Sequence, residues 1–227
     1  MSTVTQRDTY RHLILRKRLI LGGLVLLLLC SVLLDLALGP ASYSFSEVLG
    51  ALLAPDTAPA QVRVVMWDIR LPIALMAVAV GAALSLAGAQ MQTILNNPLA
   101  SPFTLGISAA ASFGAAMGLA FGVALFPLAA QYMVPVNAFI MAMLSALLIH
   151  FLSMRRGVTA ETIVLLGIAL VFTFNALLAL VQFFATEQAV AAVVFWTMGS
   201  LTKATWPKLG VICLVIVITL PIFAKRA

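Results

Sequence analysis

Charge, histidine and cysteine are all scarce in this sequence. Of its 227 residues only 9% are charged, and it has two histidines and two cysteines. Cys30 and Cys213 each lie inside an apolar run, without a CxxC motif or metal-binding spacing, which indicates packing roles for both. The acidic residues fall near the ends of apolar runs and do not converge with His12 or His150. We therefore expect no catalytic residue, no metal site and no cofactor, and a membrane enzyme is not predicted.

Apolar residues dominate instead. They make up 63% of the chain, and the mean hydropathy is +1.15, far above that of a soluble domain. The runs are long and uninterrupted, as in membrane helices, and lack the alternating polarity of a transmembrane barrel. The predicted fold class is all-α, a polytopic transmembrane helix bundle.

A single transmembrane domain is expected over residues 1–227, in which residues 1–18 precede the first span. The expected spans are about 19–38, 64–95, 105–125, 134–152, 162–184 and 209–223. The charged start and apolar run resemble a signal peptide, but the run is long and Pro40 follows it, which favours an uncleaved span. Between the first two spans, the segment SFSEVLGALL is predicted to form a short interfacial helix capped by Ser44 or Ser46.

The basic residues indicate how the chain is oriented. With six alternating spans, nine Lys and Arg residues fall on the side of the chain ends and four on the other side. The nine are Arg7, Arg11, Arg16, Lys17, Arg18, Arg155, Arg156, Lys225 and Arg226, and the four are Arg63, Arg70, Lys203 and Lys208. The positive-inside rule then predicts a cytoplasmic N-terminus. The net charge of +6 reflects this topology and does not indicate nucleic-acid binding.

The segment QTILNNPLASPFTLG interrupts the apolar pattern. Pro98 removes a backbone donor and disfavours helix at Asn97, so the second span must end or unwind there. Asn96 and Asn97 are expected to cap the freed groups, and Pro102 prolongs the break. Non-helical backbone at membrane depth requires burial in protein or access to water. The residues alone leave two interpretations open, a translocation pathway and a helix-packing crossover.

Small and polar residues mark two of the helices as internal. Gly81, Ser85 and Ala89 recur every four residues, so another helix is able to approach the second span closely. In the fifth span, Asn175 and Gln182 are seven residues apart and share one face. Their polarity fits either a water-filled pathway or hydrogen bonding within the bundle.

Two sequence motifs carry a resemblance to a known family. The stretch WDIRLPIALMAVAVGAALSLAGAQMQTILNNPLASPFTLGIS, residues 67–108, resembles the signature region of FecCD-type ABC importer permeases, which take up iron-siderophores, haem and cobalamin. VVFWTMGSL, residues 193–201, resembles a second motif of that family, after the fifth span. The motifs follow the family's order and spacing across nearly the whole chain.

The resemblance implies a type II importer and its partners. These are a second permease subunit, ABC ATPase subunits, a periplasmic or lipid-anchored binding protein, and membrane lipid, with no nucleic acid. The expected location is the bacterial inner membrane, as a multi-pass protein. The family's RLPR motif reads RLPI here, with Ile73, so only Arg70 inherits the role of docking the binding protein. About ten spans are typical of the family, so the chain is expected to be its N-terminal part.

The resemblance also implies roles for individual residues. The loop RRGVTAET places Thr159 and Ala160 at the cytoplasmic gate, and the fifth span is expected to line the cavity with Asn175 and Gln182. The residues expected at the pathway or helix break are Asn96, Asn97, Pro98, Leu99, Ala100, Pro102 and Gly106. The predicted function is translocation of an iron(III)-siderophore-type chelate, driven by a separate ATPase. The alternatives are a haem or cobalamin permease, or a non-transporting fragment or channel-like protein.

Overall fold

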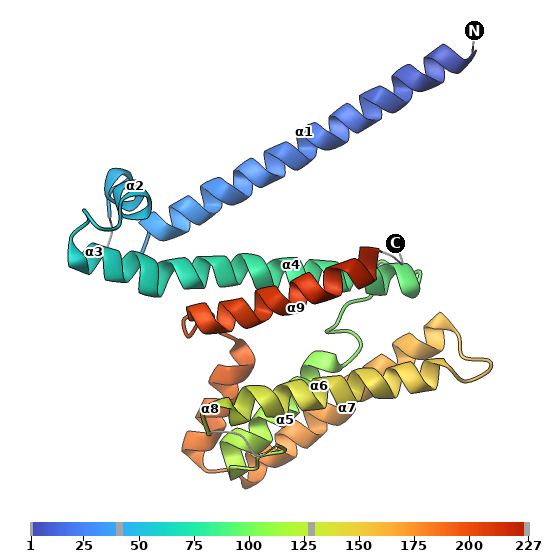
Figure 1. The fold of residues 1–227 in the computed structure, drawn as a ribbon. Coiled ribbons are helices and arrows are strands. Elements are labelled where there is room, and N and C mark those ends of the chain that lie inside the picture. The colour runs from blue at the N-terminus through green and yellow to red at the C-terminus, as the bar shows by residue number, and fades with distance from the viewer. Residues whose placement is uncertain (1, 40–42, 127–129, 225–227) are drawn as a thin grey trace. The chain divides into compact units, whose positions relative to one another are not determined.

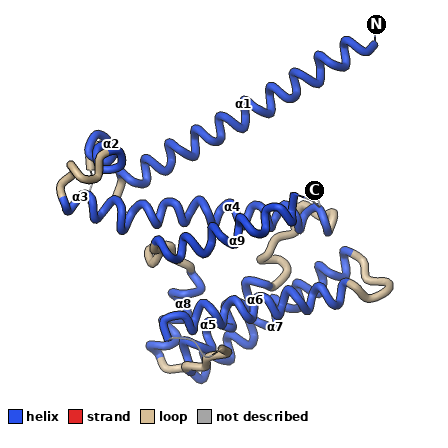
Figure 2. The backbone as a smooth tube through the Cα atoms, in the orientation of Figure 1, coloured by secondary structure: helices blue, strands red, loops and turns tan. Residues whose placement is uncertain are grey.

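The computed structural model describes residues 2–39, 43–126 and 130–224, with side chains within 12–39, 43–126 and 132–222. The elements are α1 (Ser2–Ala37), α2 (Phe45–Leu53), α3 (Ala60–Val64), the π-helical turn η1 (Val65–Arg70), α4 (Leu71–Ile94), α5 (Ile107–Phe121), α6 (Ala130–Ser153), α7 (Ala160–Phe184), α8 (Glu187–Met198) and α9 (Trp206–Ala224). Figures 1 and 2 show these helices and their loops, and the described ranges contain no strand. The predicted all-α class is confirmed.

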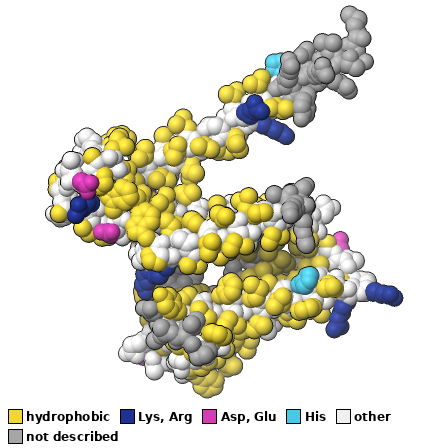
Figure 3. All heavy atoms as spheres, in the orientation of Figure 1, with side chains coloured by type: hydrophobic (Ala, Val, Ile, Leu, Met, Phe, Trp, Pro, Cys, Tyr) yellow, Lys and Arg dark blue, Asp and Glu magenta, His cyan; other side chains and the backbone are white. Residues whose placement is uncertain are grey.

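Several helices suit a membrane by length and composition. Among the described residues, four stretches are long and apolar enough to cross one: His12–Ala37, Ala60–Ile94, Tyr132–Ser153 and Ala160–Phe184. α5 and the described part of α9 are apolar but shorter. Large apolar side chains remain exposed on most of these helices, and hydrophobic atoms cover most of the face in Figure 3. Such a surface is stable in lipid and unstable in water, as in a multi-pass membrane protein.

The N-terminal residues extend the first helix. Residues 2–18, which were expected to precede the span, are helical and belong with it to one helix of 36 residues. At about 1.5 Å per residue it is longer than a hydrocarbon core of about 30 Å, so only part of it fits there. The charged residues Arg16, Lys17 and Arg18 mark where the apolar part begins. Of the other residues in the orientation count, Lys225 and Arg226 lie outside the described residues, as does Pro40.

Two glycines make α5 shorter than the expected segment 105–125. Gly106 precedes the helix with φ 76° and Gly122 follows it with φ 65°, both in the left-handed region. That conformation interrupts an α-helix, and glycine adopts it at a lower cost in free energy than other residues because it has no Cβ. The helix therefore has 15 residues, and its apolar pattern continues beyond it into turns.

Residues 1–79 and 201–217 form one compact unit. Its core joins Leu36 of α1, Val48 of α2 and Met66 of η1, all nearly fully buried. The predicted interfacial helix is α2, and its cap is Ser44: Ser44 Oγ accepts a hydrogen bond from the Glu47 N–H, and Glu47 Oε2 accepts one from the Ser44 N–H. This reciprocal pair is a capping box, which fixes where the helix begins.

Residues 80–200 and 218–227 form the second unit. In it α5 packs against α6, α7 and α8. The buried side chains are small, including Ala110, Ala115 and Ala116 of α5, so the helices approach closely. The first six residues of the VVFWTMGSL motif lie in α8. This unit contains both the NNPLASP break and the start of α7.

Candidate functional site

The end of α4 is built by the two asparagines of the break. The Asn97 N–H donates to the Gln92 carbonyl (3.1 Å) and the Asn96 N–H to the Thr93 carbonyl (3.3 Å). Asn96 has φ 45°, and it is the one non-glycine residue with positive φ in the described chain. These features form a Schellman motif, which satisfies the last carbonyls of a helix. Asn96 thus ends α4 through its backbone, whereas a side-chain cap was predicted.

The side chain of Asn97 holds the chain after the helix has ended. Its Oδ1 accepts a hydrogen bond from the Leu99 N–H (2.9 Å). The backbone carbonyl of Asn97 accepts one from the Ala100 N–H (3.2 Å). Pro98 lies between them and has no N–H to donate, so the turn leaves no orphan donor there. Asn97 was predicted to cap groups freed at the end of the helix, and its side chain instead bonds within the turn that follows α4.

A second turn continues the break around Pro102. The Thr104 Oγ1 accepts a hydrogen bond from the Ser101 N–H (2.9 Å) and donates one to the Ser101 carbonyl (2.9 Å). The Thr104 N–H in turn donates to Ser101 Oγ (3.2 Å). These groups of Ser101 and Thr104 therefore satisfy each other within the break.

Three apolar residues of the break anchor it. Leu95, Ala100 and Leu105 are buried in one cluster with Ile149 of α6 and Leu170 of α7. These three residues therefore pack as in a helix crossover, while Leu99 and Asn96 are exposed.

Gly106 and Gly167 allow the end of the break to approach α7 closely. A Cβ on Gly167 would lie 2.8 Å from the Leu105 Cα and 2.9 Å from the Thr104 carbonyl oxygen. A Cβ on Gly106 would lie 2.9 Å from the Leu170 Cβ. Since those are backbone or near-backbone atoms, neither glycine has room for a side chain. Two glycines thus let the end of the break lie directly on α7.

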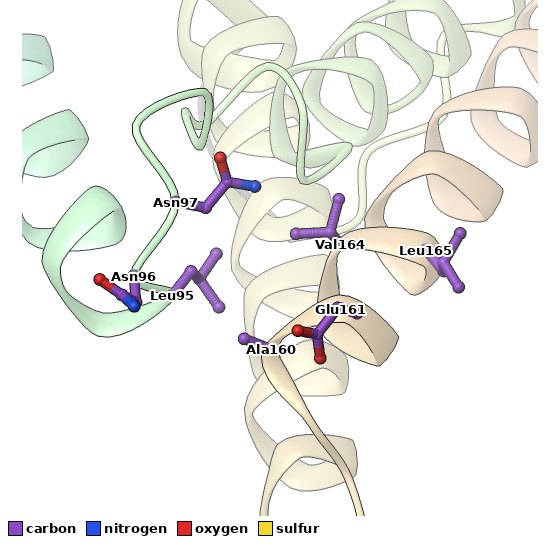
Figure 4. Close-up of a pocket in the computed structure, with 7 residues that line it drawn as sticks. All are labelled: Leu95, Asn96, Asn97, Ala160, Glu161, Val164 and Leu165. Atoms are coloured by element: carbon purple, nitrogen blue, oxygen red, sulfur yellow. The ribbon is translucent and has the colours of Figure 1, made fainter.

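A pocket of about 360 Å³ opens where the break faces the first turns of α7. One wall is formed by the end of α4 and the other by α7, as Figure 4 shows. The lining residues are Leu95, Asn96, Asn97, Ala160, Glu161, Val164 and Leu165. The structure therefore brings together two regions that the sequence predicted separately, the break and the expected gate.

The expected gate residues form the start of α7. Thr159 is the N-cap, and its Oγ1 accepts a hydrogen bond from the Thr162 N–H (3.4 Å). Ala160 is the first residue of the helix and lines the pocket. A cap of this kind sets where α7 begins, and hence where its first turn faces the break.

The other predicted site residues lie elsewhere. Asn175 is exposed and Gln182 half-buried, both further along α7, and neither lines the pocket. Arg70 is half-buried in the first unit. Its Nη1 donates to the Leu36 carbonyl (2.6 Å), and its guanidinium lies 5.2 Å from the centre of the Tyr43 ring. The docking role of Arg70 remains a prediction.

Sequence reasoning missed Gly167, Glu161 and Val164. The signal for Gly167 was present, because an isolated glycine inside an apolar helix indicates close backbone approach. For Glu161 and Val164 no signal was available, since their role depends on the break lying opposite them. Among the described residues, no group of three or more His, Cys, Asp or Glu side chains is arranged to hold a metal ion.

Known proteins resemble this chain over most of its length. A protein of Methanocaldococcus jannaschii named "Putative ABC transporter permease protein MJ0087" is 36% identical over 219 residues, which cover 93% of this chain and 62% of that protein. The molybdate import system permease protein MolB of Haemophilus influenzae is 34% identical over 196 residues, covering 84% and 56%. Other relatives are named for iron chelatin, vitamin B12, iron(3+)-hydroxamate or hemin.

A solved structure supports the same fold. It is described as "An inward-facing conformation of a putative metal-chelate type ABC transporter", and it matches with a TM-score of 0.71 and 29% identity over 89% of this chain and 61% of that one. The chain thus spans about three fifths of the length of such proteins. The model of the FecCD transport family matches residues 26–227. With both of its sequence motifs inside that match, the chain belongs to the FecCD transport family.

Proposed function

We propose that the chain is a membrane-spanning permease subunit of an ABC importer, and that it translocates an iron(III)-siderophore-type chelate. Family membership and the names of the relatives support the permease role. The observation that carries the proposal is the packing of the break onto the start of α7, around one pocket. Non-helical backbone at membrane depth is buried in protein or lines a cavity, and the packing of the break beside this pocket supports a role in a translocation path.

The identity of the cargo is the more specific part of the proposal. Relatives named for iron chelatin and iron(3+)-hydroxamate support an iron chelate. Others named for hemin or vitamin B12 support the two alternatives from the sequence, and MolB adds molybdate, which the sequence did not suggest. An iron-siderophore remains our choice among them.

The proposed partners follow from the importer class. They are a second permease subunit, two ABC ATPase subunits that hydrolyse ATP, and a substrate-binding protein outside the membrane. The chain itself would carry no catalytic residue. We place it in the bacterial inner membrane with its N-terminus in the cytoplasm, according to the distribution of Lys and Arg.

Within the permease, the break and the start of α7 would form one gate at the cytoplasmic side. Asn96 and Asn97 would face Ala160 across the pocket, while Thr159 fixes the start of the gate helix. Asn175 and Gln182 would face the cavity further along α7. Movement of α7 would then carry the break with it, because Gly167 leaves no space between them.

The cargo is tested by uptake into proteoliposomes. A permease chain extended to the length of its relatives would be reconstituted with its ATPase and binding protein, and offered ⁵⁵Fe-labelled hydroxamate siderophore, hemin, cobalamin or molybdate. We expect ATP-dependent uptake of the siderophore alone. Uptake of another cargo would overturn the iron assignment, and no ATP-dependent uptake of any cargo would overturn the importer role.

The role of the break is tested in the same vesicles. Pro98→Leu should let helix continue into the break and misplace the residues that pack on α7, so uptake should be lost. Asn97→Asp keeps the acceptor for the Leu99 N–H and serves as the matched control. Normal uptake by Pro98→Leu would show that the break is incidental to transport.

Arg70 needs a test that separates docking from capping. Its bond to the Leu36 carbonyl places a cation at the C-terminal end of α1, where the helix dipole favours positive charge. If Arg70 docks the binding protein, Arg70→Glu should weaken association at low salt and the defect should shrink at high salt. An equal loss at every salt concentration would assign the residue to the α1 terminus alone.

A further inference from the structure

The π-helical turn η1 leaves one backbone carbonyl without a helical partner. The Leu71 N–H donates to the Met66 carbonyl, five residues back. In an α-helix it would donate to the Trp67 carbonyl, four residues back. The other helical partner of the Trp67 carbonyl would be the N–H of residue 72. That residue is proline and has no N–H.

Trp206 supplies the missing donor from a distant part of the chain. Its Nε1–H donates to the Trp67 carbonyl at 2.9 Å, across 139 residues of sequence. The two indole rings are stacked, with centroids 6.4 Å apart and planes inclined by 29°. Both residues belong to the same compact unit, which includes residues 1–79 and 201–217.

The same turn also caps two other helices. Trp67 Nε1–H donates to the Ala51 carbonyl (2.9 Å) in the last turn of α2, and Arg70 Nη1–H donates to the Leu36 carbonyl (2.6 Å) in the last turn of α1. Carbonyls in a last turn have no partner within their own helix. Side chains of η1 therefore donate hydrogen bonds to carbonyls at the ends of α1 and α2, while the Trp67 carbonyl of η1 accepts its hydrogen bond from Trp206.

We propose that Trp206 is a positioning residue that holds η1 in its π-helical form, by replacing the amide proton that Pro72 lacks. The wider turn sets the directions in which Trp67 and Arg70 leave the helix, and so keeps both side chains at the ends of α1 and α2. Trp206 thereby fixes the first turns of the second span. This role is independent of the cargo and of the transport activity proposed above.

The hydrogen bond is tested by indole exchange in the purified 227-residue chain. The sequence has three tryptophans, so labelling with ¹⁵N-tryptophan gives three indole N–H signals, assigned by Trp→Phe variants. Trp196 has no indole hydrogen bond within the described residues and is the internal reference. We expect the Trp206 signal to exchange with solvent at least about tenfold more slowly than the Trp196 signal in detergent. Equal exchange rates would overturn the proposal.

A double-mutant cycle then tests the reason for the bond. Trp206→Phe keeps a stacking ring but removes the N–H, and should lower the thermal unfolding midpoint by about 2–4 °C. Pro72→Ala restores a backbone N–H that is able to serve the Trp67 carbonyl. In that background Trp206→Phe should have less than half its effect on the midpoint. Trp196→Phe controls for loss of an indole.

Two outcomes would contradict the proposal in this cycle. An unchanged midpoint in Trp206→Phe would mean that the hydrogen bond does not hold the turn. Additive effects of Trp206→Phe and Pro72→Ala would show that Trp206 acts through ring packing and does not replace the missing amide proton.

Discussion

The second and third predicted spans both have glycines on one helix face, but only one of the two faces is filled in the described structure. In α5, a Cβ on Gly114 would lie 2.5 Å from the Asn137 carbonyl oxygen, and one on Gly118 would lie 3.1 Å from Asn137 Nδ2. In α4, a Cβ on Gly81 or Gly88 would meet nothing within 4 Å. The same kind of pattern therefore has two outcomes within one chain.

The difference arises from the connection that leaves each helix. α6 comes soon after α5, and Asn137 of α6 also binds the connection, through Nδ2–H to the Val123 carbonyl (2.6 Å) and Oδ1 to the Leu125 N–H (2.9 Å). α4 is followed by the break, which packs against α7 before the chain continues into α5. Small residues thus show that a helix is able to be approached closely, whereas the connections determine which helix approaches.

The largest expected effect comes from filling the closed face. Gly114→Leu would force a side chain into the backbone of α6, and should lower the free energy of unfolding by about 3 kcal/mol or more. Gly81→Leu, on the open face of α4, should be within about 1 kcal/mol of the parent. Thermal unfolding of the 227-residue chain in detergent would measure both. Equal losses would mean that a partner also covers the face of α4.

Asn137 gives the next largest effect. It is 1% exposed, and Asn137→Leu would leave the Val123 carbonyl and the Leu125 N–H without partners. We expect a loss of about 2 kcal/mol. Asn175→Leu is the matched control, because Asn175 is exposed on α7 and should tolerate the change. If the two variants unfold at the same temperature, the connection is not held by Asn137.

The end of α4 should be less sensitive than the α5–α6 contact. Asn97→Ala removes one acceptor, for the Leu99 N–H, and should cost about 1 kcal/mol. Asn97→Asp keeps that acceptor and should unfold like the parent. Chemical denaturation at neutral pH would compare them, and an equal loss in both variants would show that the amide nitrogen matters instead.

The smallest effect is expected at α2, whose N-terminal cap involves no other helix. Hydrogen bonds from the side chain and backbone of Ser44 lower the pKa of Glu47 below its ordinary value of 4.5. A lowered pKa in the folded state contributes stability above the unfolded pKa, and this contribution disappears as the pH falls through the folded pKa. Titration below pH 4.5 should therefore loosen α2, seen as faster amide exchange. Glu47→Gln should show no such transition.

Much of the helical arrangement could be predicted from the sequence, because apolar runs and helix breakers act locally. The segments 134–152 and 162–184 lie within α6 and α7, and Ser44 was one of two predicted caps. α5 is shorter than its apolar run, because the left-handed conformations of Gly106 and Gly122 override that pattern. The break was predicted from Pro98 and its neighbours.

The geometry of the candidate site was less predictable, because it depends on contacts between distant residues. Gly167 is explained only by Leu105 lying on it, and no sequence pattern pairs the two. The hydrogen bonds of the Arg70 guanidinium to the Leu36 and Ala37 carbonyls of α1 could not be predicted from the sequence either, and its docking role remains a prediction. Such pairings depend on tertiary packing, which hydrophobic patterns do not encode.

The central claim is that the break and the start of α7 act as one unit in transport, and Gly167→Ala tests it most directly. Its Cβ would meet the Leu105 Cα at 2.8 Å, whereas a Cβ on Gly88 would meet nothing within 4 Å. ATP-dependent uptake would be measured for both variants in a permease extended to the length of its relatives, at equal membrane abundance. We predict that Gly167→Ala loses most of the uptake and Gly88→Ala retains it; equal uptake by the two variants would contradict the account.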